Sequence, residues 1–129
     1  MRGEHRSFEY AISPLSDKRP YMREIGVFIL GQLGTPDFPY KSESTQLIAE
    51  RLTSDKSYAV RAAAAAALGH LKAIDQLDVL IRATSDESAD VRACVAFALT
   101  LMKRRPRARE ALRALRNDKS AEVRSWVED

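Results

Sequence analysis

One short pattern occurs four times along the chain of 129 residues: an aspartate, four further residues, an apolar residue and an arginine. The copies begin at Asp17, Asp55, Asp86 and Asp118, so their starts lie 38, 31 and 32 residues apart. A period in this range is typical of supersecondary units that stack on one another, because one unit cannot bury its apolar face alone. The pattern therefore predicts an array of stacked repeats.

A helix is predicted to begin just after each aspartate. Two residues beyond the aspartate, three copies have a serine, which is a good N-cap. The first copy has Pro20 nearby, and proline is favourable at the first position of a helix. The predicted inner helices cover residues 21–33, 58–71 and 89–102. We expect Gly34 and Gly69 to end two of them, because glycine readily adopts the left-handed conformation of a helix C-terminus.

A second set of helices is predicted to precede the aspartates, because apolar residues there recur at helical spacing. These outer helices cover about 4–13, 44–53, 74–84 and 106–116. The proline of Ser13-Pro14 is expected to end the first, and a proline-rich loop at 35–40 explains the longer first period. The prediction is an all-α, right-handed superhelix (solenoid) of about three and a half repeats. It forms a single array over residues 1–129, with repeats at about 4–34, 41–71, 73–102 and 105–129.

The fourth copy is short, since only five residues follow Arg124, among them Trp126 and Val127. Terminal repeats normally carry a polar cap, and two large apolar residues do not form one. We therefore expect the chain to be a fragment of a longer array, the alternative being a frayed end.

Composition argues against several classes of protein. Cys94 is the only cysteine, which excludes an internal disulfide framework. No apolar run is long enough to span a membrane, and the N-terminal residues do not form a secretory signal, so the expected location is cytoplasmic, without a membrane. His5 and His70 lack metal-ligand spacing, and the sequence has no phosphate-binding loop or nucleophile elbow. We expect a protein that is not an enzyme and needs no cofactor.

The elements D-K-S-Y-A-V-R-A-A-A-A-A-A-L-G and D-E-S-A-D-V-R-A-C-V-A-F-A-L resemble HEAT repeats, in particular the short bacterial repeats of phycobilisome-lyase type. This similarity covers nearly the whole chain. The stretch 16–34, with E-I-G-V-F-I-L-G-Q-L-G, is also similar to enterobacterial HEAT-like proteins, some of them linked to immunity against Rhs-type toxins. The resemblance implies a scaffold that binds another macromolecule, in its sharpest version a bacterial toxin domain. An accessory subunit of a bilin lyase is an alternative, although fold alone does not carry that function across.

The repeated arginine lies near the start of each inner helix, where a cation interacts unfavourably with the helix dipole. The resemblance implies that it meets the aspartate of its own or the next repeat, so that the pairs form a ladder. The alternative is a basic row for phosphate groups, made of Arg23, Arg61, Arg92 and Arg124.

Phasing the inner helices at 100° per residue gives a predicted buried face and an opposite face. The buried face holds Val60, Ala64, Ala67, Leu68 and Leu71. The opposite face is predicted to form the concave, protein-binding side, with Glu24, Phe28, Gly31, Ala62, Ala66, Gly69, Ala93, Phe97 and Thr100. An aromatic side chain on a solvent-facing stripe predicts an anchor for a protein partner. The alternative is that both phenylalanine rings fill gaps between adjacent repeats.

The formal net charge is +3, but residues 103–116 alone carry +6, from seven basic residues and one acid. The arginines predicted to face solvent there are Arg104, Arg105, Arg107, Arg109, Arg113 and Arg116. They allow three interpretations: a solvated helix face, a site for an acidic protein, or a site for a nucleic-acid backbone. No aromatic residues interleave with them, which argues against stacking of single-stranded bases.

Overall fold

The helices of the protein alternate between two layers. We analysed a computed structural model, which describes residues 9, 12–33 and 41–127. A helical turn at 12–15 comes first. The elements that follow are α2 (Pro20–Leu33), α3 (Lys41–Ser54), α4 (Tyr58–His70), η1 (Ile74–Gln76), α5 (Leu77–Arg82), η2 (Ala83–Ser85), α6 (Ala89–Thr100), α7 (Pro106–Ala114), η3 (Leu115–Asn117) and α8 (Ala121–Ser125).

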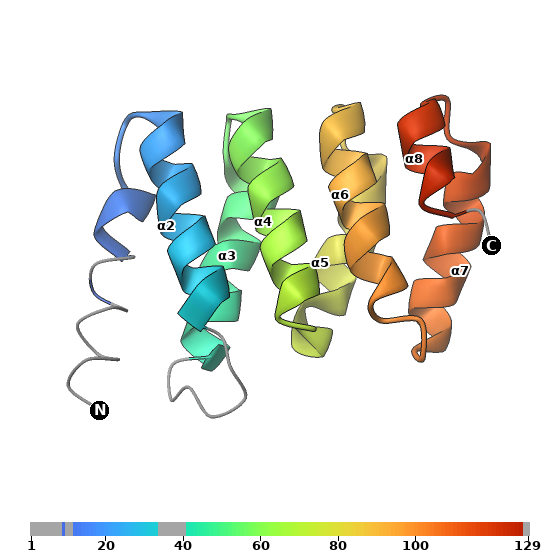
Figure 1. The fold of residues 1–129 in the computed structure, drawn as a ribbon, viewed down its shortest axis with the longest axis horizontal. Coiled ribbons are helices and arrows are strands. Elements are labelled where there is room, and N and C mark those ends of the chain that lie inside the picture. The colour runs from blue at the N-terminus through green and yellow to red at the C-terminus, as the bar shows by residue number, and fades with distance from the viewer. Residues whose placement is uncertain (1–8, 10–11, 34–40, 128–129) are drawn as a thin grey trace.

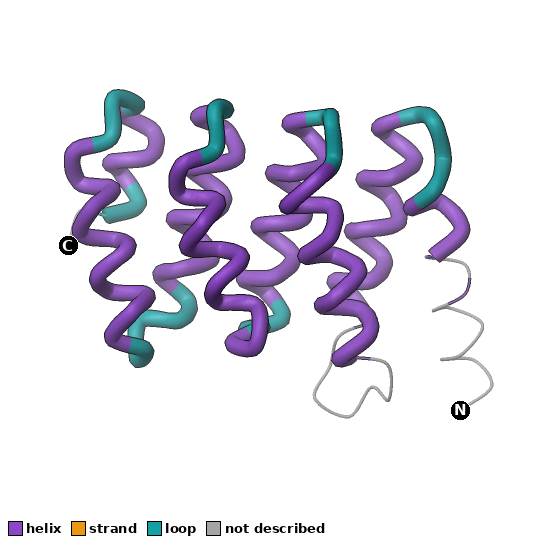
Figure 2. The backbone as a smooth tube through the Cα atoms, turned by 180° about the vertical axis from the view of Figure 1, so that it is seen from behind, coloured by secondary structure: helices purple, strands orange, loops and turns teal. Residues whose placement is uncertain are grey.

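The inner helices α2, α4, α6 and α8 stand side by side in one row, and α3, α5 and α7 form the layer behind them (Figure 1). The view from behind shows the outer layer in front, joined to the inner one by short turns (Figure 2). Helix α4 packs most extensively against α6, α2 and α3. The described part of the chain is therefore an all-helical solenoid, as the period of the aspartates predicted.

The predicted starts of the inner helices are confirmed. Helix α2 begins at Pro20. The hydroxyl groups of Ser57, Ser88 and Ser120 each accept a hydrogen bond from the backbone N–H three residues further on, at the first turn of α4, α6 and α8. These caps satisfy N–H groups that have no partner inside the helix.

Two predicted helix ends and one predicted continuous helix are corrected. Gly69 lies inside α4, and the left-handed residue after that helix is Lys72, with φ 50°. The first helical segment continues past Pro14 to Leu15, whose burial favours the extra residues. The single helix expected over 74–84 is a short α-helix between two 3₁₀ turns. Gly34, the loop at 35–40 and the first eight residues lie outside the described residues.

The core lies between the two layers. All five residues predicted for the buried stripe of α4 are buried. Leu80 of α5 and Leu99 of α6 are fully buried as well, and each such leucine contributes about 2 kcal/mol by leaving water. The core continues without a break from Leu15 to Val123.

Gly69 has a packing role. A Cβ atom placed there would lie 2.7 Å from the Cα atom and 2.9 Å from the Cβ atom of Ala98 on α6. A real Cβ cannot approach a backbone atom so closely, so Gly69 sets the separation of α4 and α6. The prediction that Gly69 lies on the solvent side of its helix is therefore wrong, because this residue is buried against the next inner helix.

The repeated arginines reach the aspartate of the next repeat, and together they form what we call the arginine ladder. Each uses Nε and one terminal nitrogen to bind both carboxylate oxygens. The Nε to oxygen distances are 2.8 Å for Arg23–Asp55, 3.0 Å for Arg61–Asp86 and 2.8 Å for Arg92–Asp118. The second contacts measure 3.0, 3.2 and 3.2 Å in the same order. Such paired contacts are stronger and more directional than a single ion pair.

The remaining terminal nitrogen of each arginine ties down the turn of its own repeat. It donates to the backbone carbonyl oxygen of the preceding aspartate, at 2.6 to 2.9 Å, and Arg124 does the same with Asp118. In turn, Asp55, Asp86 and Asp118 accept a hydrogen bond from the backbone N–H two residues on. The carboxylates of the ladder thus occupy the guanidinium groups of Arg23, Arg61 and Arg92. These three arginines therefore do not form the alternative, a row that binds phosphate groups.

The ladder also shifts the ionisation of Asp55 and Asp118. Burial would raise the pKa of Asp55, but the hydrogen bond from Arg23, the amide of Ser57 and the charges of Arg23 and Arg51 outweigh it, so the pKa lies below its ordinary value. The hydrogen bond from Arg92 likewise lowers the pKa of Asp118. Both carboxylates are therefore more stable as anions in the folded protein than in the unfolded chain.

We expect Arg92→Ala to lower the free energy of unfolding by about 3 kcal/mol, since it leaves the carboxylate of Asp118 buried without its partner. Only 7% of the Arg92 side chain and 8% of the Asp118 side chain are exposed. Urea denaturation measures the loss. Arg19→Ala is the matched control, because its pair with Asp17 lies at the surface. Equal losses in the two variants would contradict the structural role of the ladder.

The protein is expected to lose stability as the pH falls below about 4, the range in which an unfolded aspartate takes up its proton. A carboxyl group whose pKa is lowered by folding stabilises the protein above the unfolded pKa, and this contribution disappears as pH falls through the folded pKa. Denaturation at a series of pH values tests this. Asp55→Asn should be less stable at neutral pH and less sensitive to acid; an equally steep acid loss would argue against Asp55 as a source.

Gly69→Ala should destabilise the protein by about 2 kcal/mol, because α4 and α6 must move apart to admit the methyl group. Gly31→Ala is the matched control, since its nearest neighbour outside its own helix is the Cβ atom of Ala67, at 3.3 Å. There the better helix propensity of alanine, about 1 kcal/mol, offsets a small adjustment. Thermal denaturation of both variants decides the point, and a harmless Gly69→Ala would refute the close approach.

Candidate functional site on the inner face

We call the solvent-exposed side of the inner helices the inner face. It consists of three rows, found two, five and nine residues after the repeated arginines Arg23, Arg61, Arg92 and Arg124. The middle row is Phe28, Ala66 and Phe97. The flanking rows are Ile25, Ala63, Cys94 and Trp126 on one side, and Gln32, His70 and Leu101 on the other. All of these side chains are exposed or half-buried.

The predicted concave side included the middle row correctly. Its other positions are displaced around each inner helix from the positions that are exposed in the structure. Glu24 and Ala62 are half-buried, and Ala93, at 3% exposure, lies in the core. Thr100 is half-buried and donates a hydrogen bond from its hydroxyl to the carbonyl oxygen of Phe97, at 2.6 Å. Ala93 therefore offers a partner no surface, and its inclusion in the binding side was wrong.

The displacement has a simple physical reason. An inner helix such as α4 contacts the inner helices on both sides and the outer helix behind it. Only a narrow side of the helix therefore stays exposed, and this side does not lie directly opposite the apolar stripe. Sequence reasoning consequently missed Ile25, His70, Leu101 and Trp126. Counting from the ladder arginine, which the sequence does reveal, would have found them.

The two predicted aromatic anchors have different roles. The ring of Phe97 meets His70 edge to face at 5.3 Å between centroids and meets Trp126 in the same way, also at 5.3 Å. It thus joins α4, α6 and the end of α8, as the gap-filling alternative described. Phe28, in contrast, is 64% exposed.

A hollow of about 190 Å³ lies beside Phe28, between α2 and α4. Gly31, Ala63, Ala66 and Ala67 supply small lining residues. The longer side chains in its lining are Phe28, Gln32 and His70. We call it the Phe28 hollow; its size suits one apolar side chain of a partner.

An apolar strip on α2 continues from this hollow. Tyr21, Ile25 and Phe28 are exposed and follow one another at helical spacing. The guanidinium carbon of Arg19 lies 5.4 Å from the centre of the Tyr21 ring, and the side chain also donates to the Tyr21 hydroxyl at 3.1 Å. The strip therefore has a polar border at the start of the helix.

Cys94 lies half-buried on the inner face. Burial raises the pKa of its thiol, and the charges of Glu122 and Asp90 raise it further. The thiol consequently stays protonated at neutral pH, which makes it a poor nucleophile. Within residues 9, 12–33 and 41–127, no three His, Cys, Asp or Glu side chains come together in a group that could hold a metal ion.

The basic segment divides between two places. Arg104 and Arg105 line a hollow at the lower ends of α4 and α6. Arg109, Arg113 and Arg116 line another beside α7 and α8. Arg107 pairs with Asp78 on α5. The six arginines therefore do not share a single hollow, although Lys103 lines both of these hollows and Arg105 lines a third one together with Arg107.

Trp126 belongs to the same hollow as Arg109, Arg113 and Arg116, and 43% of it is exposed. No aromatic residue interleaves with the arginines in the sequence, but the fold places Trp126, which follows α8, beside three of them. This proximity could not be seen from neighbouring positions in the sequence.

Comparison with known proteins identifies the family. A model of HEAT repeats matches residues 8–83 and again 45–129, which together cover nearly the whole chain. The chain therefore belongs to the HEAT-repeat family, as the repeated motif indicated. HEAT repeats typically form non-catalytic scaffolds that mediate protein interactions.

The fold is also similar to a solved structure, the X-ray structure of the Escherichia coli protein YibA. The TM-score is 0.51 at 25% sequence identity, and the match covers 98% of this chain but 59% of YibA. A search of curated proteins found none that matches. In the described part of the chain, the helices are too short or too polar to cross a membrane.

Proposed function

We propose that this protein is a non-enzymatic scaffold that binds another protein through its inner face. The distribution of exposed large apolar residues carries the proposal. Of the eight such residues in the described chain, five lie on this face or extend it: Tyr21, Ile25, Phe28, Leu101 and Trp126. Apolar side chains gathered on one face are typical of a surface that a partner covers.

In this proposal the Phe28 hollow is the centre of the interface. Its floor of alanine and glycine lets a partner approach the backbone of α4, and Phe28 offers a large ring at its edge. Covering an exposed aromatic or aliphatic side chain contributes about 2 kcal/mol, so Phe28 and Ile25 together favour specific binding. In our proposal the ladder and the core hold this surface rigid, which lowers the entropic cost of association.

One version of this proposal has a bacterial toxin domain as the partner, and it rests on the resemblance of residues 16–34 to immunity-linked HEAT-like proteins. The scaffold would act by occlusion, because a rigid inner face can cover the working site of the toxin. That mechanism requires no catalytic group from the scaffold.

We expect Phe28→Asp to weaken capture of the protein partner from native cell extract by roughly 30-fold, equivalent to about 2 kcal/mol for the loss of a central aromatic contact. Affinity purification with quantitative mass spectrometry measures the effect. Tyr58→Asp is the matched control, because Tyr58 is an exposed aromatic residue outside the three rows.

Both variants should melt at the temperature of the wild type, since both side chains are exposed. Phe97→Asp is a poorer test, because that ring packs between two others. Undiminished capture by Phe28→Asp, or equal loss with Tyr58→Asp, would contradict the proposed interface.

A further inference from the structure

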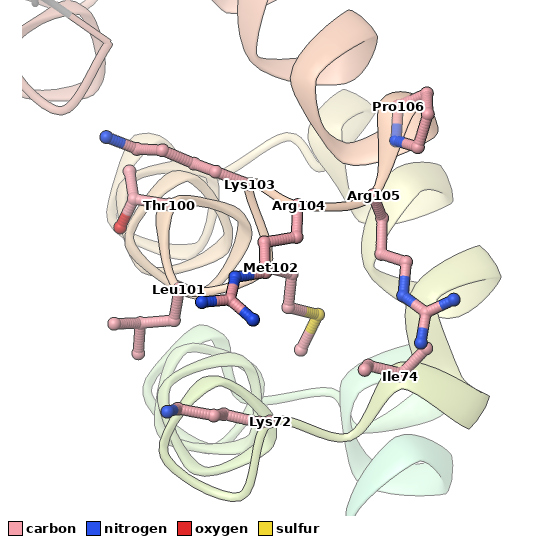
Figure 3. Close-up of a pocket in the computed structure, with 9 residues that line it drawn as sticks. All are labelled: Lys72, Ile74, Thr100, Leu101, Met102, Lys103, Arg104, Arg105 and Pro106. Carbon is pink, nitrogen blue, oxygen red and sulfur yellow. The ribbon is translucent and has the colours of Figure 1, made fainter.

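A larger hollow lies at the C-terminal ends of α4 and α6, and Figure 3 shows the residues that line it. Its volume is about 800 Å³. The turn after α4 and the turn between α6 and α7 line it. We call it the basic hollow, and its lining residues are Lys72, Ile74, Thr100, Leu101, Met102, Lys103, Arg104, Arg105 and Pro106.

The charged residues in this lining are all cations. Lys72, Lys103, Arg104 and Arg105 are exposed, and the side chain of each is without a hydrogen bond or ion pair to any residue that the structure describes. In Figure 3 the guanidinium group of Arg104 is directed toward the side of the hollow that holds Lys72, whereas Lys103 extends away from it.

Two acids lie in the hollow next to this one. Asp75 and Asp78 line the adjoining hollow, together with Arg105 and Arg107. Asp78 pairs with Arg107, and Asp75 accepts a hydrogen bond from the Thr45 hydroxyl at 3.4 Å. Arg105 therefore shares the adjoining hollow with acids, whereas the lining of the basic hollow, which holds Lys72 and Arg104, contains no acid in the part of the chain that the structure describes.

The basic hollow also has an apolar component. Ile74 is 42% exposed and Leu101 40% exposed. Figure 3 shows Leu101 on the same side as Arg104 and Lys72, and Ile74 next to Arg105. Leu101 also belongs to the inner face, in the row of His70, so the basic hollow continues the inner face at its lower edge.

We propose that the basic hollow binds an acidic segment of the protein partner, with carboxylates at Lys72 and Arg104 and an aliphatic side chain against Leu101. This inference rests on the proposed function, because the segment would extend from a partner seated on the inner face. Carboxylates fit the guanidinium of Arg104 with two parallel hydrogen bonds. Aliphatic side chains in the lining suit a peptide, whereas single-stranded nucleic acid needs aromatic platforms that this lining lacks among its described residues.

The test uses a short fluorescein-labelled peptide of glutamate and leucine, followed by fluorescence anisotropy. The wild type should bind it, with affinity that falls as salt rises, and should not bind the same peptide with glutamine in place of glutamate. Arg104→Glu should weaken binding about 10-fold, because attraction becomes repulsion. Arg82→Glu is the matched control, since Arg82 is exposed on the outer helix α5 and undergoes the same change of charge.

Lys72→Gly separates loss of charge from loss of folding. Lys72 has a left-handed backbone conformation that glycine adopts more readily. The variant should therefore melt at a higher temperature while it binds the peptide a few-fold more weakly. Weaker binding by a more stable protein cannot result from unfolding.

Several outcomes would overturn the inference: no binding of the glutamate peptide, equal loss in Arg82→Glu, or tighter binding of an oligothymidylate of equal charge, which would indicate a nucleic-acid site. Failure of the proposed function can be distinguished from failure of this inference. A partner lost by Phe28→Asp but fully retained by Arg104→Glu would leave the inner face in place and refute the acidic segment. A partner retained by Phe28→Asp would refute the inner face, whatever the peptide does.

Discussion

The fold depends on a buried contact between an arginine of one repeat and an aspartate of the next. Each ladder arginine holds that carboxylate through two nitrogens and its own turn through the third. Because the guanidinium group is planar and its donors are fixed, the contact constrains how the turn of one repeat lies against the inner helix before it, while close packing such as that of Gly69 on Ala98 sets the separation of the helices. The three rows of the inner face follow from it, since they lie at constant counts from the same arginine.

Much of the fold could be predicted because its signals are local. The serine caps and the aspartate period depend only on nearby residues, and the structure has helices where they indicated. Gly69 shows the limit: a glycine near a helix end can serve a left-handed turn or a close helix contact, and the sequence alone does not distinguish them. The contact with Ala98 decides between the two, and it joins residues of different repeats.

The site was harder to predict, because it depends on distances between repeats. The angular position of residues around each helix correctly predicted the row of Phe28. It wrongly predicted that Ala93 is exposed, because this angle alone does not reveal that an inner helix has neighbours on both sides. Lys72 and Arg104 are separated by a whole repeat in the sequence, and only the stacking of α4 and α6 brings them to one hollow. The same is true of Trp126 and the arginines of α7.

The ladder and the inner face use different residues of the same helices. The turn aspartate, the capping serine and the arginine hold the array together, whereas the side chains two, five and nine residues further on face outward. In evolutionary terms, the outward positions that lie free of other rings, such as that of Phe28, can change with little effect on folding, so a lineage can acquire a new partner without building a new scaffold. A duplicated copy of such a gene could diverge in recognition while its architecture stays the same.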